Sequence, residues 1–251
     1  MRAAGSIALA CAVEGGRTRL RTLRCEGLSR SSRAFAEPAG AIRLMLATLG
    51  PGVLGGDAFA LEGAVEPGAA LVAAGQMATP VFAGDAVSRS DARWRIAAGA
   101  RLHVAGEPLL LEPGSAHVTA AHFALEADGI ALVAETFALH GRARLSLRTQ
   151  ATLDGRLVFR DAVELAGERP GAYGTVALIA ADPGLRAAFA ARAGAWAAAA
   201  GAVRAGVGET AAAVVVRLTG ARVWDVLRAG RAIAALAPAS GGGPSAPGRT
   251  P

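Results

Sequence analysis

The sequence of 251 residues contains no lysine and no asparagine, few aromatic residues and only two cysteines. Without lysine no Gly-x-x-x-x-Gly-Lys-Ser/Thr loop can exist, so the chain does not hydrolyse nucleotides through a P-loop. Cys11 and Cys25 are too few for a Cys-rich metal site, and their spacing fits neither a zinc ligand pair nor a redox pair. No apolar run approaches the roughly 18 residues of a membrane-spanning helix. We therefore expect reduced structural thiols, a cytoplasmic location and no membrane partner.

The positive charge of the chain comes from arginine alone. The 26 arginines outnumber the 20 acidic residues, which gives a net charge of +6. A nucleic-acid surface would need arginines clustered with aromatic side chains, whereas here the arginines stand singly in strand-like segments. We expect a solvated, alternating face and no nucleic-acid partner. With 53% apolar residues, the chain can also bury a sizeable core.

The first residues predict a β-hairpin. An apolar stretch from Ile7 to Val13 runs into a turn at Glu14 to Gly16, and side chains then alternate between polar and apolar, which is the period of a half-buried strand. The apolar stretch is at the lower end of the length range of a signal peptide, so we interpret it as a strand. A secreted lipoprotein anchored through Cys11 is the alternative.

The middle of the chain repeats one theme. Glycine-centred turns are separated by 16, 15, 15 and 15 residues, and each precedes a segment rich in Val, Leu, Ile and Ala; they lie at Gly68, Gly84, Gly99, Gly114 and Gly129. Pro-Gly between alternating apolar residues is a turn signal, because proline fixes φ and glycine supplies a positive φ. Units this small cannot bury their own apolar faces, so they must stack as successive hairpins or as a solenoid-like ladder.

The last third changes period. Asp182 followed by proline predicts a helix start, and apolar residues three and four apart predict a helix over 183–200. A buried strand is expected over 212–219 and a second helix over 222–237. We expect residues 1–237 to form a single domain and residues 238–251, rich in Gly, Pro and Ser, to be a disordered tail.

Carboxylates are the most suggestive polar residues. Asp57 follows a double glycine that allows close backbone approach, while Glu107 and Glu135 lie in or beside apolar strand segments, where acids are seldom tolerated unpaired. Gln76, Glu107 and His122 each lie eight residues after a turn glycine, so they are expected to form a polar stripe on one side of the ladder. Such oxygen and imidazole groups would bind divalent ions weakly and exchangeably.

Several segments, in order, resemble the UreD (UreH) family of urease accessory proteins. They are a glycine-rich segment from Leu49 to Asp57 that ends in Gly-Gly-Asp, an element from Gln76 to Phe82, a segment from Glu107 to Leu111, and an acidic strand from Glu135 to Arg142 that ends in Gly-Arg. The resemblance covers nearly the whole chain except its tail.

The resemblance implies a non-enzymatic maturation factor. It implies a mainly β fold, an elongated stacked-strand (β-helix-like) two-layer body with two C-terminal α-helices. It also implies binding to a UreF-like helical protein, through it to a UreG-like GTPase, and to the urease apoprotein, for delivery of nickel. No permanently bound cofactor is expected, and Asp57, Glu107 and Glu135 are the candidates for a transient nickel passage.

Two other interpretations are open at this point. One is a structural or interaction β-ladder protein without a metal role, for which the strand composition is sufficient. The other is a hydrolase that uses His103 or His122, which would need a pocket joining one of these histidines to Ser, Cys or a carboxylate.

Overall fold

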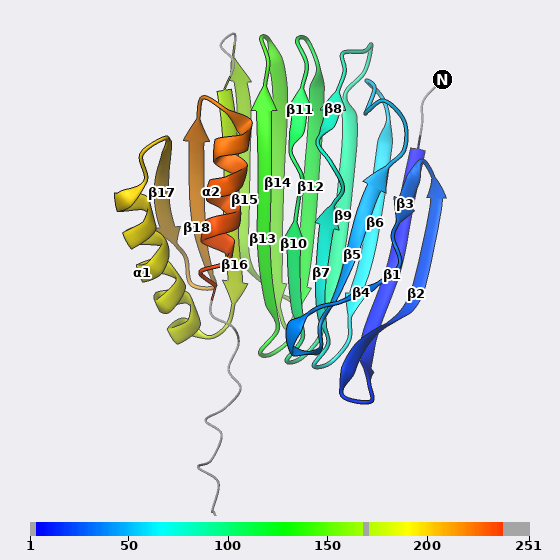
Figure 1. Ribbon diagram of the computed structural model, residues 1–251, viewed down its shortest axis with the longest axis vertical. Helices are drawn as coiled ribbons and strands as arrows, with labels where there is room; N and C mark the ends of the chain where they lie inside the picture. Colours follow the sequence, from blue (N-terminus) through cyan, green and yellow to red (C-terminus); the bar gives the residue numbers. More distant parts are fainter. Residues whose placement is uncertain (1–3, 168–170, 238–251) are drawn as a thin grey trace, which may run out of the picture.

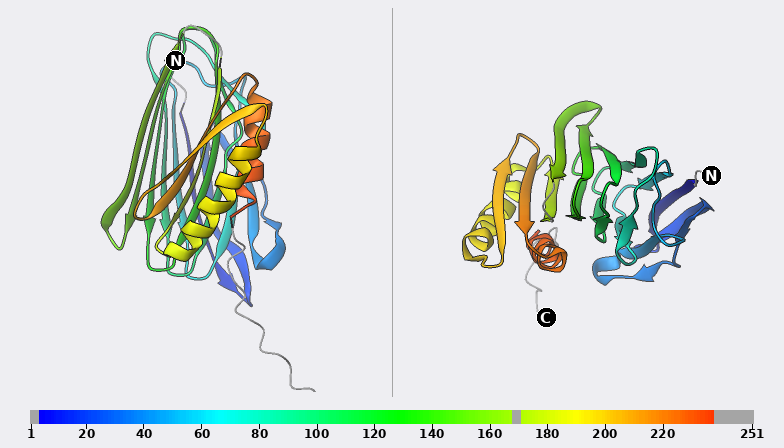
Figure 2. Two further views of the ribbon diagram at one scale, coloured as in Figure 1. Left: turned by 90° about the vertical axis from the view of Figure 1, so that its left-hand side faces the viewer. Right: turned by 90° about the horizontal axis from the view of Figure 1, so that it is seen from above.

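A computed structural model describes residues 4–167 and 171–237. Two β-sheets face each other as two layers, and two helices lie on the outside of one sheet at its C-terminal end (Figures 1 and 2). The prediction of a mainly β, two-layer body with two C-terminal helices is confirmed. The predicted tail, residues 238–251, lies outside the described residues.

The first sheet has seven strands in the order β15-β14-β12-β9-β6-β1-β2. Their bounds are β1 (Ala4–Glu14), β2 (Arg17–Gly27), β6 (Ala58–Val65), β9 (Ser88–Ile96), β12 (Ala116–Leu125), β14 (Ala143–Leu153) and β15 (Arg156–Gly167). The predicted first hairpin is the β1–β2 pair, which is antiparallel.

The second sheet follows the order β17-β18-β16-β13-β10-β7-β5-β3, with three short strands beside this path. The strands on the path are β3 (Ser29–Ser31), β5 (Ile42–Thr48), β7 (Ala70–Gly75), β10 (Arg101–Ala105), β13 (Ile130–Leu139), β16 (Gly171–Ala180), β17 (Val203–Glu209) and β18 (Ala213–Gly220). The short strands are β4 (Phe35–Ala36), β8 (Thr79–Val81) and β11 (Leu109–Leu111), and a 3-10 turn, η1, covers Pro38–Gly40.

The middle of the chain winds between the two sheets. Strands β6, β9, β12 and β14 are parallel neighbours in the first sheet, and β5, β7, β10 and β13 are parallel neighbours in the second. One complete coil is therefore the stretch of sequence from Gly68 to Gly99, which is twice the spacing between successive turn glycines. This winding settles the choice between hairpins and a ladder in favour of the solenoid.

The predicted polar stripe of Gln76, Glu107 and His122 is wrong, because successive turns are only half a coil apart. Successive turns lie at opposite ends of the strands, so Gln76 and Glu107 belong to the second sheet while His122 lies on β12 of the first, between Arg93 and Gln150. Residues at the same offset from successive turn glycines therefore alternate between sheets, and only those from alternate turns stack.

The turn glycines serve two purposes. Gly68, Gly99 and Gly114 adopt φ of 69°, 66° and 77°, as expected of left-handed turn positions. Gly84 does not, and instead a Cβ added to it would lie 2.8 Å from the Cα of Gly55. The double glycine before Asp57 thus permits a backbone contact between two loops, as its sequence suggested.

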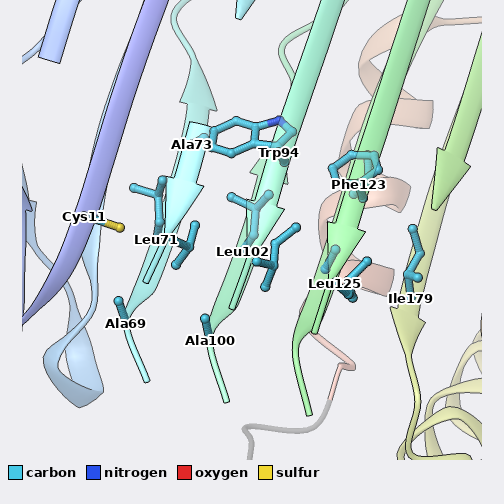
Figure 3. Packing of buried hydrophobic residues seen from close by; sticks show 14 of the residues in the cluster. Cys11, Ala69, Leu71, Ala73, Trp94, Ala100, Leu102, Phe123, Leu125 and Ile179 are labelled. Carbon is cyan, nitrogen blue, oxygen red and sulfur yellow. The ribbon is translucent and has the colours of Figure 1, made fainter. Parts of the chain in front are cut away.

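The core falls into three parts. The largest lies between the sheets and is built from stacked side chains of successive coils (Figure 3); it includes Leu71, Trp94, Leu102 and Phe123. A second part joins the outer face of the second sheet to the helices, and a third lies between the sheets towards the end with Val53. Burial of each large apolar side chain contributes about 1.5–3 kcal/mol, so the stacking stabilises the solenoid.

The two helices pack on the outer face of the second sheet. Helix α1 (Pro183–Ala199) begins at Asp182, whose Oδ1 accepts hydrogen bonds from the backbone N–H groups of Gly184 (2.8 Å) and Leu185 (3.3 Å). Helix α2 (Val223–Ala234) packs on β13, β16 and β18. No helix in the described part of the chain is both long and apolar enough to cross a bilayer.

Cys11 lies in the middle of β1 and is fully buried. Burial, with a further contribution from Glu66, raises the pKa of its thiol to about 12. Cys11 and Cys25 are both free thiols. A lipid anchor on Cys11 would require removal of the residues before it, which form most of β1 and include the core residues Ile7 and Leu9, so the fold argues against the lipoprotein alternative.

Candidate functional site

A layer of polar side chains crosses the space between the sheets. Glu135, Thr175 and Arg217 are register neighbours on β13, β16 and β18. Arg217 donates from Nη1 to Thr175 Oγ1 (2.5 Å) and from Nη2 to the carboxylate of Asp161, on β15 of the opposite sheet. This ion pair connects the two sheets, and water screens it in part because the side chains of Arg217 and Asp161 are 37% and 23% exposed.

Glu135 lies at one end of this layer, next to Thr175. It lines a cavity of about 260 Å³ that strands of both sheets form and that opens to solvent beside the exposed Met77. Burial raises the pKa of Glu135 to about 7, the nearby Arg217 acts to lower it, and Asp161 acts to raise it. The side chain is half-buried by accessible area because it borders the cavity. Near neutral pH both the protonated and the ionised form of Glu135 are therefore populated.

A second polar group faces the same cavity without a partner. Thr119 lines the cavity from β12, and its Oγ1 is buried and makes no hydrogen bond within the described residues. Buried hydroxyl groups are almost always satisfied in folded proteins. The Thr119 hydroxyl is therefore available to bind a polar ligand, or a water molecule that hydrates one, inside the cavity.

Glu107 lies where the second sheet opens to the outside. It follows β10, and a Cβ on Gly75 would lie 2.8 Å from the Glu107 nitrogen, so the glycine lets the Glu107 segment pass closely. Glu107 Oε1 accepts a 2.5 Å bond from Arg231 Nη2 on α2. The residue lines both the cavity and a groove on the outer face of the sheet.

This outer groove has a volume of about 620 Å³ and runs over β7, β10 and β13 beside α2. Its floor is made of small residues, among them Ala70, Ala74, Ala105 and Ala134. It lies on the side of the second sheet that carries α2 in Figure 2. The groove is long and largely apolar, as surfaces that receive protein segments are.

Asp57 lies apart from the cavity. It is 2% exposed, and its Oδ2 accepts a 2.9 Å bond from the backbone N–H of Leu54. Across the first sheet it is aligned with Ser88 and then His117, both buried. Ser88 Oγ lies 2.8 Å from His117 Nδ1, and burial lowers the pKa of His117 to about 4.

The structure thus unites two of the three predicted carboxylates. Glu107 and Glu135 line one cavity, whereas Asp57 lines neither this cavity nor the groove. Within residues 4–167 and 171–237 no three His, Cys, Asp or Glu side chains are grouped so as to hold a metal ion. The arrangement offers few and weak oxygen ligands, which bind a hard or borderline divalent ion exchangeably.

Sequence reasoning missed the charged residues that influence Glu135. Asp161 and Arg217 are separated by 56 positions, and neither belongs to a recognisable motif. Asp91 also borders the cavity, but its carboxylate accepts a bond from Arg89 (2.7 Å). The one usable signal for the polar layer was an acidic residue inside an apolar strand, at Glu135.

The histidines give little support to hydrolysis. His103 lines the outer groove with Glu107, but Glu107 is bonded to Arg231 and the described groove lining contains no serine or cysteine. Burial, with Arg43 nearby, lowers the pKa of His103. His122 lines neither the groove nor the cavity. The pocket that the hydrolase interpretation requires is thus only partly present, without a nucleophile.

Comparison with known proteins agrees with the motifs. The family described as UreD urease accessory protein matches residues 3–251. A curated relative, the urease accessory protein UreD of Opitutus terrae, is 34% identical over 126 residues, which cover 47% of this chain. The match covers 46% of that relative, so the chain spans about half the length of the curated relative that it matches. The extent of the family match, over nearly every residue, shows that this chain belongs to the UreD family of urease accessory proteins.

Proposed function

We propose that this protein is a cytoplasmic, non-enzymatic urease maturation factor that passes nickel through the cavity between its sheets. It acts with a UreF-like helical protein and a UreG-like GTPase on the urease apoprotein. The observation that carries the proposal is the cavity between the two sheets that Glu107 and Glu135 both line. Family membership supports the role in urease maturation.

Weak binding suits an ion that must be handed on. A nickel ion is here the cargo, and a tight cage of several nitrogen or sulfur ligands would retain it. Two carboxylates and a hydroxyl, from Glu107, Glu135 and Thr119, give it oxygen contacts that water can replace. Because the pKa of Glu135 is about 7, entry of the ion can displace a proton near neutral pH, and its exit can restore that proton.

Asp57 has a smaller part in this proposal. Its hydrogen bond to the backbone of Leu54 fixes the loop at the double glycine. Asp57 lies beyond the cavity at the end of the same interior face, where its carboxylate can act as a further oxygen ligand. A transient role of Asp57 in nickel passage therefore stays a prediction.

The C-terminal helices supply a surface for the helical partner. In α1, the residues Phe189, Ala190 and Ala193 are buried, while most of the remaining alanine-rich surface is exposed or half-buried. Trp224 at the start of α2 is 51% exposed. Apolar side chains on neighbouring helices that meet solvent mark a protein contact.

Filling the cavity tests the passage without removing a ligand. Ala121 lines the cavity from β12, and Ala121→Leu places a larger apolar side chain into space that the cavity already offers. Urease co-expressed with this variant and the other accessory proteins is expected to contain severalfold less nickel, measured by elemental analysis of the purified enzyme.

The matched control is Ala162→Leu on β15, where the alanine is exposed on the outer face. It is expected to leave the nickel content unchanged. Wild-type nickel content with a folded Ala121→Leu protein would contradict the passage and favour the alternative of a purely structural β-ladder protein.

A further inference from the structure

The lining of the outer groove contains more basic than acidic side chains. Three arginines line it, Arg43, Arg101 and Arg231, while Glu107 is the one acidic residue in its described lining. Arg43 bonds to Glu37 (2.5 Å), a residue outside the groove. An apolar floor with an excess of basic side chains complements an apolar segment that carries carboxylates, so the fitting occupant is a helix of a partner protein with an acidic edge.

Arg231 donates a hydrogen bond to Glu107, the one acidic residue in the described lining of the groove. The Arg231 side chain is 61% exposed while that of Glu107 is 19% exposed, so the pair reaches from solvent at α2 to the wall of the inner cavity. Glu107 is a lining residue of both spaces, and the pair with Arg231 holds its carboxylate on the groove side, away from Glu135 of the cavity lining.

We propose that the Glu107–Arg231 pair couples the groove to the cavity. When a helix of a partner protein binds in the groove, one of its carboxylates pairs with Arg231. Glu107 is thereby released from Arg231 and binds the ion in the cavity. This inference rests on the proposed function, and it adds the acidic chemistry of the partner segment and the linkage between docking and nickel binding.

Two consequences follow from competition for one guanidinium group. Glu107 opposes docking, because the partner must displace it from Arg231. A divalent ion that binds Glu107 from the cavity side removes this competitor, so the ion strengthens docking, and by reciprocity docking strengthens binding of the ion.

The experiment measures the affinity of the purified chain for the UreF-like helical protein by calorimetry, with and without added Ni²⁺. Arg231→Ala is expected to weaken binding about tenfold, since it removes a charge-assisted contact. Glu107→Gln is expected to tighten binding about threefold, in the range of a partly exposed ion pair. The double variant should behave like Arg231→Ala alone, and Ni²⁺ should tighten binding of the wild type but not of Glu107→Gln.

Arg228→Ala is the control on the same helix. Arg228 is 73% exposed and pairs with Asp225 three residues earlier, outside the groove lining, so its loss should leave the affinity unchanged. Weaker binding by Glu107→Gln, no effect of Arg231→Ala, or no binding of the wild type would overturn the inference.

The two proposals fail in different ways. If Ni²⁺ does not change docking of the wild type while Ala121→Leu still lowers the nickel content of urease, then the coupling is wrong and the passage stands. If Ala121→Leu leaves the nickel content unchanged, the passage itself is wrong, whatever the docking affinities are.

Discussion

Replacement of Glu135 by glutamine is expected to make the protein more stable at alkaline pH and at the same time unable to supply nickel. Glutamine keeps the shape of the side chain but removes the charge that the cation needs. The nickel content of co-expressed urease should fall by about tenfold, as for loss of an important metal contact. Glu62→Gln, on an exposed glutamate of the first sheet, is the control.

The stability change follows from the direction of the pKa shift. The pKa of Glu135 rises from 4.5 to about 7 on folding, so the folded state holds the proton more tightly than the unfolded chain. The resulting stability is present below pH 4.5 and is lost as the pH rises through 7. Glutamine never ionises, so Glu135→Gln should gain about 1–2 kcal/mol over the wild type between pH 5 and pH 8, with allowance for partial screening at the cavity.

Urea unfolding at a series of pH values measures this difference. A variant that is less stable than the wild type at pH 8 would show that the Glu135 carboxylate is compensated by its surroundings. A more stable variant that still delivers nickel normally would remove Glu135 from the passage. Opposite effects on stability and delivery are the expected signature of a residue retained for function.

Gly63→Ala is expected to destabilise the solenoid strongly for so small a change. Gly63 on β6 is the register neighbour of Trp94 on β9, and a Cβ at Gly63 would lie 2.1 Å from the Cε3 and Cζ3 atoms of the indole. Trp94 is 2% exposed and lies among stacked core residues, so the ring cannot move away freely (Figure 3). Overpacking of this kind costs about 1–3 kcal/mol.

Thermal and urea unfolding of this variant test the packing. Gly208→Ala on β17 is the matched control, because a Cβ there meets nothing within 4 Å. Trp94→Leu makes room beside the glycine, so the double variant Gly63→Ala with Trp94→Leu should lose less than the sum of the single losses. A Gly63→Ala protein as stable as Gly208→Ala would show that the indole relocates without cost.

Local signals predicted the elements, and long-range contacts decided the site. The capping Asp182 and the turn glycines act within a few residues, so the first helix and the repeated turns were visible in the sequence. The assignment of successive strands to opposite sheets depends on how the chain winds, and it separated His122 from Glu107. Strand β17 was missed because its sequence, with glycines at 206 and 208, carries little strand signal.

The candidate site was predictable only in part for the same reason. Glu135 drew attention as an acid in an apolar strand, and Glu107 as an acid beside one. That both border one cavity, and that Arg217 and Asp161 complete the polar layer, depends on register between strands far apart in the chain. Asp57 was chosen for the same close approach that the structure shows, yet that approach serves the loop and not the cavity.

The winding of the coils also bears on how the molecule avoids forming fibres. A parallel ladder presents open backbone at each extremity, where a second molecule could add itself as one more layer. Here the first sheet ends in β2, an antiparallel strand with the exposed arginines Arg19, Arg21 and Arg24, of which Arg21 and Arg24 are paired with Glu14 and Glu26. A copy that adds to this border would have to strip water from these charged side chains, which keeps the stack finite.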